Sequence, residues 1–150
     1  REYSRLLGVD TRFVSNIINH RRGTSRSGRK IYTLYDIYPH ADLVTYPSNF
    51  EGFGNAFIEA IYFKKPILIN RYATFVRDIE PLGFDLAVMD GFLSKKTVQS
   101  VVDILESSKR MQKMVGNNYA IAARHYSYAM LRRQLDNLMA NVFGVNHDRD

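Results

Sequence analysis

The residues best suited to chemistry are two carboxylates, Glu51 and Glu59, which stand eight positions apart in the stretch YPSNFEGFGNAFIEAI at 46–61. Gly52 and Gly54 lie between them, and glycine lets the backbone adopt dihedrals closed to other residues and approach a ligand closely. A carboxylate accepts hydrogen bonds from hydroxyl groups, and one carboxylate can accept both hydroxyls of a ribose diol. The spacing alone also fits two solvated surface glutamates, which are common in proteins.

The elements around the two glutamates are predicted to be a strand, a glycine-containing loop and a helix. Residues 42–46 contain strand formers, and Pro47-Ser48-Asn49 ends that run. From about Asn55 the apolar residues recur near a period of 3.6, which indicates a helix that Asn55 could cap. A helix start has free N–H groups and the positive end of a dipole, so this stretch predicts a site for an anion such as a diphosphate.

The combined pattern resembles the donor-site signature of retaining glycosyltransferases with the GT-B fold, in the large glycogen-synthase-like and sucrose-synthase-like group. The residues that carry the resemblance are Ala41-Asp42, Tyr46-Pro47-Ser48, Glu51-Gly52-Phe53-Gly54, Glu59-Ala60 and, downstream, Lys65-Pro66-Ile67-Leu68-Ile69. A weaker likeness continues through residues 119–126 to about Tyr128.

This resemblance implies a role for each residue of the turn. Glu51 is expected to be the catalytic residue that contacts the donor sugar, and Glu59 is expected to bind the ribose. The backbone of Gly54, Asn55 and Ala56 is expected to hold the diphosphate. The full set of donor-binding residues is Gly52, Phe53, Gly54, Asn55, Ala56 and Glu59. Members of the group usually need no bound metal, so we expect no metal and no cofactor besides the nucleoside diphosphate sugar.

The activity implied by the resemblance is transfer of a sugar, with retention, to a hydroxyl acceptor on a sugar, a lipid or a small molecule. In this group the active site lies between a donor lobe and a separate N-terminal acceptor lobe. Residues 1–150 are therefore expected to be a nucleotide-sugar-binding domain fragment that is inactive alone. The acceptor lobe and the first strands of the donor lobe, where the group's diphosphate-binding Arg and Lys sit, would be absent. A sugar-nucleotide epimerase on the same fold is an alternative.

The net charge of +6 is concentrated in the first part of the chain. Residues 1–30 hold eight basic and two acidic side chains, whereas the other 120 residues hold 13 of each sign. The basic loop at 20–30 has three interpretations: a solvated loop, a contact for an anionic donor or membrane surface, or a non-catalytic nucleic-acid-binding module. The loop has no aromatic residues for base stacking, so we expect no nucleic-acid partner.

Composition narrows the class of protein further. The chain has no cysteine, which excludes disulfides and thiolate metal sites. His125 and His147 are isolated and have no ligand-like spacing. There is no apolar run of about 18 residues and no signal peptide, so we expect a soluble cytoplasmic protein, with peripheral membrane contact as an option.

The order of predicted elements indicates an α/β fold. Strands are predicted near 12–18, 42–46, 67–69 and 85–88. They alternate with helices, one of them over 31–40, which predicts a Rossmann-like open parallel sheet with helices on both faces, as in the C-terminal half of a GT-B fold. A helical C-terminal extension follows, in three segments that begin at Ser94, near Lys109 and after Ser127.

The loop after the predicted strand at 67–69 carries two arginines, Arg71 and Arg77. In parallel α/β sheets, ligands bind at the carboxyl ends of the strands, so both guanidinium groups could reach an anionic donor or an acceptor. Pairing with Asp78 or Glu80 on the surface is an equal alternative.

Overall fold

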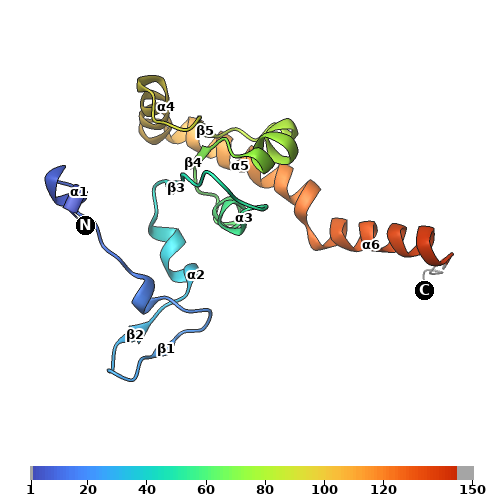
Figure 1. The fold of residues 1–150 in the computed structure, drawn as a ribbon, viewed down its shortest axis with the longest axis horizontal. Helices are drawn as coiled ribbons and strands as arrows, with labels where there is room; N and C mark the ends of the chain where they lie inside the picture. Colours follow the sequence, from blue (N-terminus) through green and yellow to red (C-terminus); the bar gives the residue numbers. More distant parts are fainter. Residues whose placement is uncertain (1, 145–150) are drawn as a thin grey trace. The chain divides into compact units, whose positions relative to one another are not determined.

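The computed structural model describes residues 2–144, and the chain divides into two compact units at 1–41 and 42–150. The elements of the first unit are α1 (Glu2–Leu6), η1 (Ser15–Ile17), β1 (Gly23–Thr24), β2 (Lys30–Ile31), α2 (Leu34–Ile37) and η2 (Tyr38–His40). Those of the second unit are β3 (Val44–Tyr46), α3 (Asn55–Tyr62), β4 (Ile67–Asn70), η3 (Phe75–Ile79), η4 (Glu80–Leu82), β5 (Ala87–Met89), α4 (Lys95–Glu106), α5 (Ser108–Tyr126) and α6 (Tyr128–Phe143) (Figure 1).

The first unit departs from the sequence prediction because it contributes no strand to a parallel sheet. The strand predicted at 12–18 is wrong: residues 15–17 form the 3-10 helix η1, and Ile18 makes only an isolated bridge to Tyr32. A strand is stable only where a partner strand pairs with it, and within this unit the bridge at Tyr32 is the sole pairing of the segment.

The basic loop at 20–30 contains a small hairpin in which β1 pairs antiparallel with β2. Its turn is closed by hydrogen bonds from Ser25 N to Arg29 O (2.8 Å) and from Gly28 N to Ser25 O (3.0 Å). The helix predicted over 31–40 is shorter than expected, since Thr33 and Asp36 form a capping box that fixes the start of α2 at Leu34.

The second unit is built on a parallel sheet of three strands in the order β3-β4-β5. This result confirms the predicted α/β fold with a parallel sheet. In the register of the sheet, Tyr46 lies opposite Ile69, and Asn70 lies opposite Met89. The carboxyl ends of all three strands therefore meet at one edge, which is where ligands bind in sheets of this kind.

Strand β4 is the centre of the core, and all four of its residues are buried. A run of apolar residues without alternation is typical of a parallel strand that is covered on both faces. One cluster of the core joins Leu68 of β4 to Ala87, Ile104 and Met114, which come from β5, α4 and α5. On α3, the buried residues are Phe57, Ala60 and Ile61.

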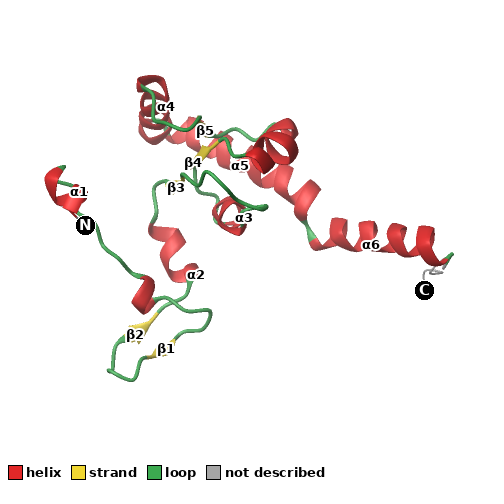
Figure 2. Ribbon diagram, viewed as in Figure 1, coloured by secondary structure: helices red, strands yellow, loops and turns green. Residues whose placement is uncertain are grey.

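The three helices after β5 begin within a residue or two of the predicted starts at Ser94, near Lys109 and after Ser127, and each has a serine cap (Figure 2). The Ser94 hydroxyl accepts a hydrogen bond from Thr97 N at the start of α4, and Ser127 accepts one from Met130 N at the start of α6. The predicted helical C-terminal extension is confirmed. Between residues 2 and 144, no helix has the length and apolar character needed to cross a bilayer.

Candidate functional site

The candidate site begins where β3 ends and the chain turns into α3. Gly54 is the residue before the helix, and it is buried with φ of +90°. A Cβ atom at this position would lie 2.9 Å from Tyr46 Oη and 3.1 Å from Tyr72 Oη. Two separate constraints therefore require glycine at this position: the left-handed backbone, and the lack of space for a Cβ atom beside the two tyrosine hydroxyls. At Gly52 the backbone needs no positive φ and a Cβ would meet nothing within 4 Å, so the two glycines are not equivalent.

The start of α3 has no side-chain cap. The prediction that Asn55 caps the helix is wrong, because Gly54 occupies the cap position and Asn55 is the first helical residue. Phe57 N bonds to Gly54 O at 3.0 Å. Asn55 and Ala56 lie in the first turn of the helix, where backbone N–H groups have no carbonyl partner within the helix. These two amides are therefore suited to an external acceptor such as a phosphate.

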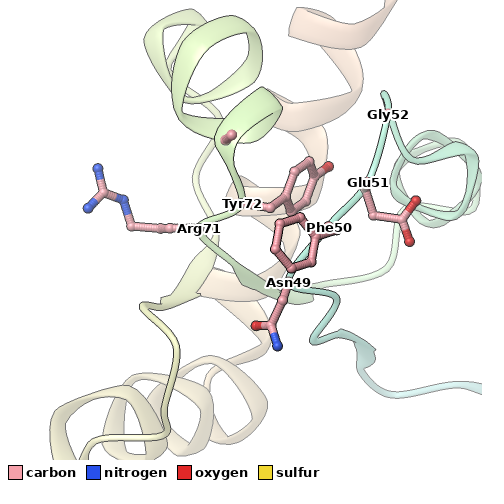
Figure 3. A pocket seen from close by; sticks show the side chains of 7 residues that line it. Asn49, Phe50, Glu51, Gly52, Arg71 and Tyr72 are labelled. Carbon is pink, nitrogen blue, oxygen red and sulfur yellow. The ribbon is translucent and has the colours of Figure 1, made fainter.

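Glu51 lies in the loop between β3 and α3 and is exposed. It lines an open pocket of about 510 Å³ at the carboxyl edge of the sheet. The residues that line this pocket are Asn49, Phe50, Glu51, Gly52, Arg71, Tyr72 and Ala73 (Figure 3). Of the predicted site residues, the pocket brings together Glu51 and Gly52, and its lining does not include Phe53 to Ala56 or Glu59. Glu59 is half-buried on α3, one turn beyond the helix start.

Two tyrosines, Tyr46 and Tyr72, lie against the loop that carries Glu51, with both hydroxyls close to Gly54. Burial, a hydrogen bond to the Glu51 carboxylate and the charge of that group raise the pKa of Tyr46 to about 12. Tyr72 is buried, and its hydroxyl donates to Phe53 O at 3.0 Å. Burial and the nearby charge of Glu51 also raise the pKa of Tyr72. Both phenols stay protonated at neutral pH, and the Tyr72 hydroxyl is a hydrogen-bond donor to the loop.

The loop is held from two further directions. The Thr74 hydroxyl donates to Glu51 O at 3.2 Å. The Phe53 ring packs edge-on against Tyr126 of α5, with 4.8 Å between the ring centroids, and Tyr126 in turn stacks on Phe84. These contacts fix the backbone on both sides of Gly52, so the pocket has a defined wall.

Asn70 connects the loops that follow all three strands. It is buried at the end of β4, and its amide nitrogen donates to Asn49 Oδ1 (2.7 Å) and Ser48 O (3.2 Å) in the loop after β3. Its Oδ1 accepts a hydrogen bond from Gly91 N (2.8 Å) in the loop after β5. Sequence reasoning missed this residue, although a lone amide at the end of an otherwise apolar strand is the signal of a buried polar group with specific partners.

We expect the Asn70→Ala variant to lower the free energy of unfolding by about 2 kcal/mol, because it leaves buried polar groups such as Gly91 N without a partner. Urea denaturation of the chain measures this change. The matched control is Asn117→Ala on the exposed surface of α5, which should stay within about 0.5 kcal/mol of wild type. Equal stability of the two variants would contradict a connecting role for Asn70.

The two arginines after β4 are engaged in surface ion pairs. The Arg71 guanidinium donates two hydrogen bonds to Glu80 (2.9 and 3.0 Å) and one to Asp90 (3.1 Å). Arg77 makes two hydrogen bonds of 2.7 Å to Asp78. The side chains of Arg71 and Glu51 extend in opposite directions (Figure 3). The structure thus shows surface ion pairs for both arginines, and Arg71 also lines the pocket beside Glu51.

The site has no built-in metal centre within the described part of the chain. Residues 2–144 contain no group of three or more His, Asp or Glu side chains that could hold a metal ion. His125 lies on α5 beside Tyr126, whereas His147 lies outside the described residues. The chemistry that the site offers is hydrogen bonding by carboxylate, phenol and amide groups.

Comparison with known proteins places this site within a described sequence family. The family model for glycosyl transferases group 1 matches residues 20–121, which include the strand β3, the loop with Glu51 and the helix α3. A mannosylglucosylglycerate synthase of Petrotoga mobilis is 40% identical over 86 residues, or 57% of this chain and 19% of the relative. A mannosylglucosylglycerate synthase of Thermotoga maritima is 31% identical over 144 residues, or 87% of this chain and 32% of the relative. The chain thus spans a third or less of the length of these relatives.

Proposed function

Because the chain belongs to the glycosyl transferases group 1 family, we propose that residues 1–150 are the nucleotide-sugar-binding domain of a retaining glycosyltransferase. The full-length enzyme would move a sugar from a nucleoside diphosphate sugar to a hydroxyl acceptor. An acceptor lobe outside this chain would complete the active site, so residues 1–150 would be inactive alone. The observation that carries the proposal is the uncapped start of α3, which stands directly after the loop that places Glu51 in the pocket.

Each residue of the turn has a role in this proposal. The amides at Gly54, Asn55 and Ala56 bind the diphosphate, since a helix start concentrates N–H donors and positive potential at one point. Gly52 and Phe53 shape the loop that lies against the donor. Glu51 accepts hydrogen bonds from hydroxyls of the donor sugar, and Glu59 accepts those of the ribose.

The reaction in this proposal depends on charge and position. Negative charge develops on the diphosphate as the bond to the sugar breaks, and amide donors that are already oriented stabilise that charge without reorganisation. Glu51 holds the donor sugar in the orientation in which the acceptor hydroxyl can attack it. The site residues supply hydrogen bonds throughout, and no metal is required for these roles.

The two relatives also suggest a product. Both are named mannosylglucosylglycerate synthases. We propose the same product, a mannosylglucosylglycerate, for the full-length protein. Product analysis of the full-length enzyme by mass spectrometry and NMR tests this point, and the anomeric configuration of the product tests retention. An isomerised sugar nucleotide in place of a new glycosidic bond would indicate an epimerase.

The binding test is calorimetric titration of the chain with UDP, GDP and ADP. We expect at least one of the three to bind, because the start of α3 offers its amides to a diphosphate whichever base is attached. Uridine, guanosine and adenosine are the controls, and they should give little heat since they lack the anion. A folded sample that gives no heat with any of the three diphosphates would contradict the proposed function.

A further inference from the structure

Tyr72 is the second residue after β4, and it reaches from the sheet to the loop before α3. Its side chain is directed toward the part of the loop at Gly52 (Figure 3). The residue is 2% exposed, and its ring lies edge-on to Tyr46 and tilted against Phe75, with 6.2 Å and 5.9 Å between the ring centroids. A buried phenol needs a hydrogen-bond partner, and the Tyr72 hydroxyl has one in Phe53 O at 3.0 Å.

This hydrogen bond fixes the peptide group that joins Phe53 to Gly54. The peptide is trans and planar, so its carbonyl and its N–H point in opposite directions. Because the Tyr72 hydroxyl holds the carbonyl oxygen of this group, the N–H of Gly54 is directed away from the tyrosine. The Tyr72 oxygen also lies 3.1 Å from the position that a Cβ of Gly54 would take, so the phenol is in close contact with the same peptide.

The Phe53–Gly54 peptide needs such a contact because its second residue is glycine. Glycine tolerates positive and negative φ about equally, so the peptide before it can rotate at little steric cost. Rotation by half a turn would put the Phe53 carbonyl oxygen where the Gly54 N–H now lies. A carbonyl oxygen repels a diphosphate, whereas an N–H binds it. Gly54 is buried, and among residues 2–144 no backbone carbonyl accepts a hydrogen bond from its N–H, so this donor is suited to a ligand.

We propose that Tyr72 is a positioning residue for the donor diphosphate, and that the bond from its hydroxyl to Phe53 O keeps the Gly54 N–H in the orientation that meets the diphosphate. This inference rests on the proposed function of the turn at the start of α3. It gives a residue of the loop after β4 a role in donor binding, which it performs through the Gly54 amide.

The first test is calorimetric titration of the full-length enzyme with UDP, GDP and ADP, in the wild type and in Tyr72→Phe. The variant removes one oxygen and keeps the ring packing. We expect the affinity for a diphosphate that binds the wild type to fall about 10-fold, the usual scale for one hydrogen bond to a charged group. The matched control is Tyr128→Phe, at a tyrosine that is 90% exposed, and it should bind like the wild type. Thermal unfolding of each variant reports whether the fold is kept.

An NMR signal of the peptide itself separates positioning from a structural role. Carbonyl-13C phenylalanine and 15N-glycine together give a nitrogen–carbonyl correlation only for Phe-Gly peptides, and residues 1–150 have two of these, at 53–54 and 143–144. The variant Phe53→Leu identifies the first signal by removing it. In Tyr72→Phe that signal should move in the free enzyme, because its carbonyl loses a donor, and its response to the diphosphate should shrink. The signal of 143–144 should stay unchanged.

Three outcomes would overturn the proposal. The first is wild-type affinity in Tyr72→Phe. The second is weaker binding with an unmoved Phe53–Gly54 signal, since the hydroxyl would then act by another route. The third is a Phe53–Gly54 signal in the wild type that does not respond to a diphosphate that binds. Absence of heat with all three diphosphates in the wild type is a failure of the proposed function, and it is read without the tyrosine variant.

Discussion

Alanine in place of Glu51 in the full-length enzyme is expected to lower the turnover number by about 10²-fold or more, the scale for removing one contact made in the transition state. Glu51 is exposed, and its carboxylate lies at a pocket on the carboxyl edge of the sheet. The loss should therefore appear in kcat, and the free energy of unfolding should change by less than about 1 kcal/mol. Steady-state kinetics and urea denaturation measure the two quantities on the same protein.

The matched control for this prediction is Glu106→Ala. Glu106 is an exposed glutamate at the end of α4, outside the lining of the pocket. Its replacement should leave both kcat and stability near wild type. If Glu51→Ala retains the kcat of the control variant, Glu51 has no part in the reaction, and the pocket beside it is not the donor site.

Replacing Gly54 by alanine is expected to lower the free energy of unfolding of the chain by about 3 kcal/mol, through backbone strain and a steric clash. The backbone at Gly54 has φ of +90°, which side-chain-bearing residues rarely adopt. The new methyl group would also meet Tyr46 Oη at 2.9 Å and Tyr72 Oη at 3.1 Å. Because the Tyr72 hydroxyl also bonds to Phe53 O in the loop, relief of the clash would move the start of α3, and affinity for a nucleoside diphosphate should fall as well.

Gly52→Ala is the control for Gly54→Ala, since the two glycines are two positions apart in the same loop. At Gly52 there is open space for a Cβ and no positive φ. Its replacement should therefore change stability by less than about 0.5 kcal/mol. Urea denaturation of both variants gives the comparison, and a Gly54→Ala chain as stable as Gly52→Ala would show that the turn does not have the close packing described.

The elements that the sequence predicts correctly are those whose signals are local. The apolar run after Pro66 identifies β4, and the serines at 94 and 127 mark helix starts, because a cap acts on amides two or three residues away. The strand expected at 12–18 fails for the opposite reason. Strand formation depends on pairing with a partner that is distant in sequence, and an apolar run carries no information about whether that partner exists.

For the candidate site too, the features with local sequence signals could be predicted and the long-range contacts could not. The spacing of Glu51, Gly54 and Glu59 locates the loop and the helix start, and the structure places Glu51 at a pocket. The contacts that hold this loop were not predictable, since Asn70 and Tyr72 reach back across about 20 residues to bond with Asn49 and Phe53. Asn55 illustrates a competition between local signals: asparagine favours the cap position, but the left-handed backbone at that position requires Gly54.

The measurement that tests the central claim most directly is NMR of the 15N-labelled chain during titration with UDP, GDP and ADP. If the start of α3 binds the diphosphate, the amide resonances of Gly54, Asn55 and Ala56 should shift most, together with those of the loop at Glu51. Those shifts should saturate with the same affinity that calorimetry reports. Shifts confined to the basic hairpin at 20–30, with residues 51–56 unchanged, would contradict the account and place anion binding elsewhere in the chain.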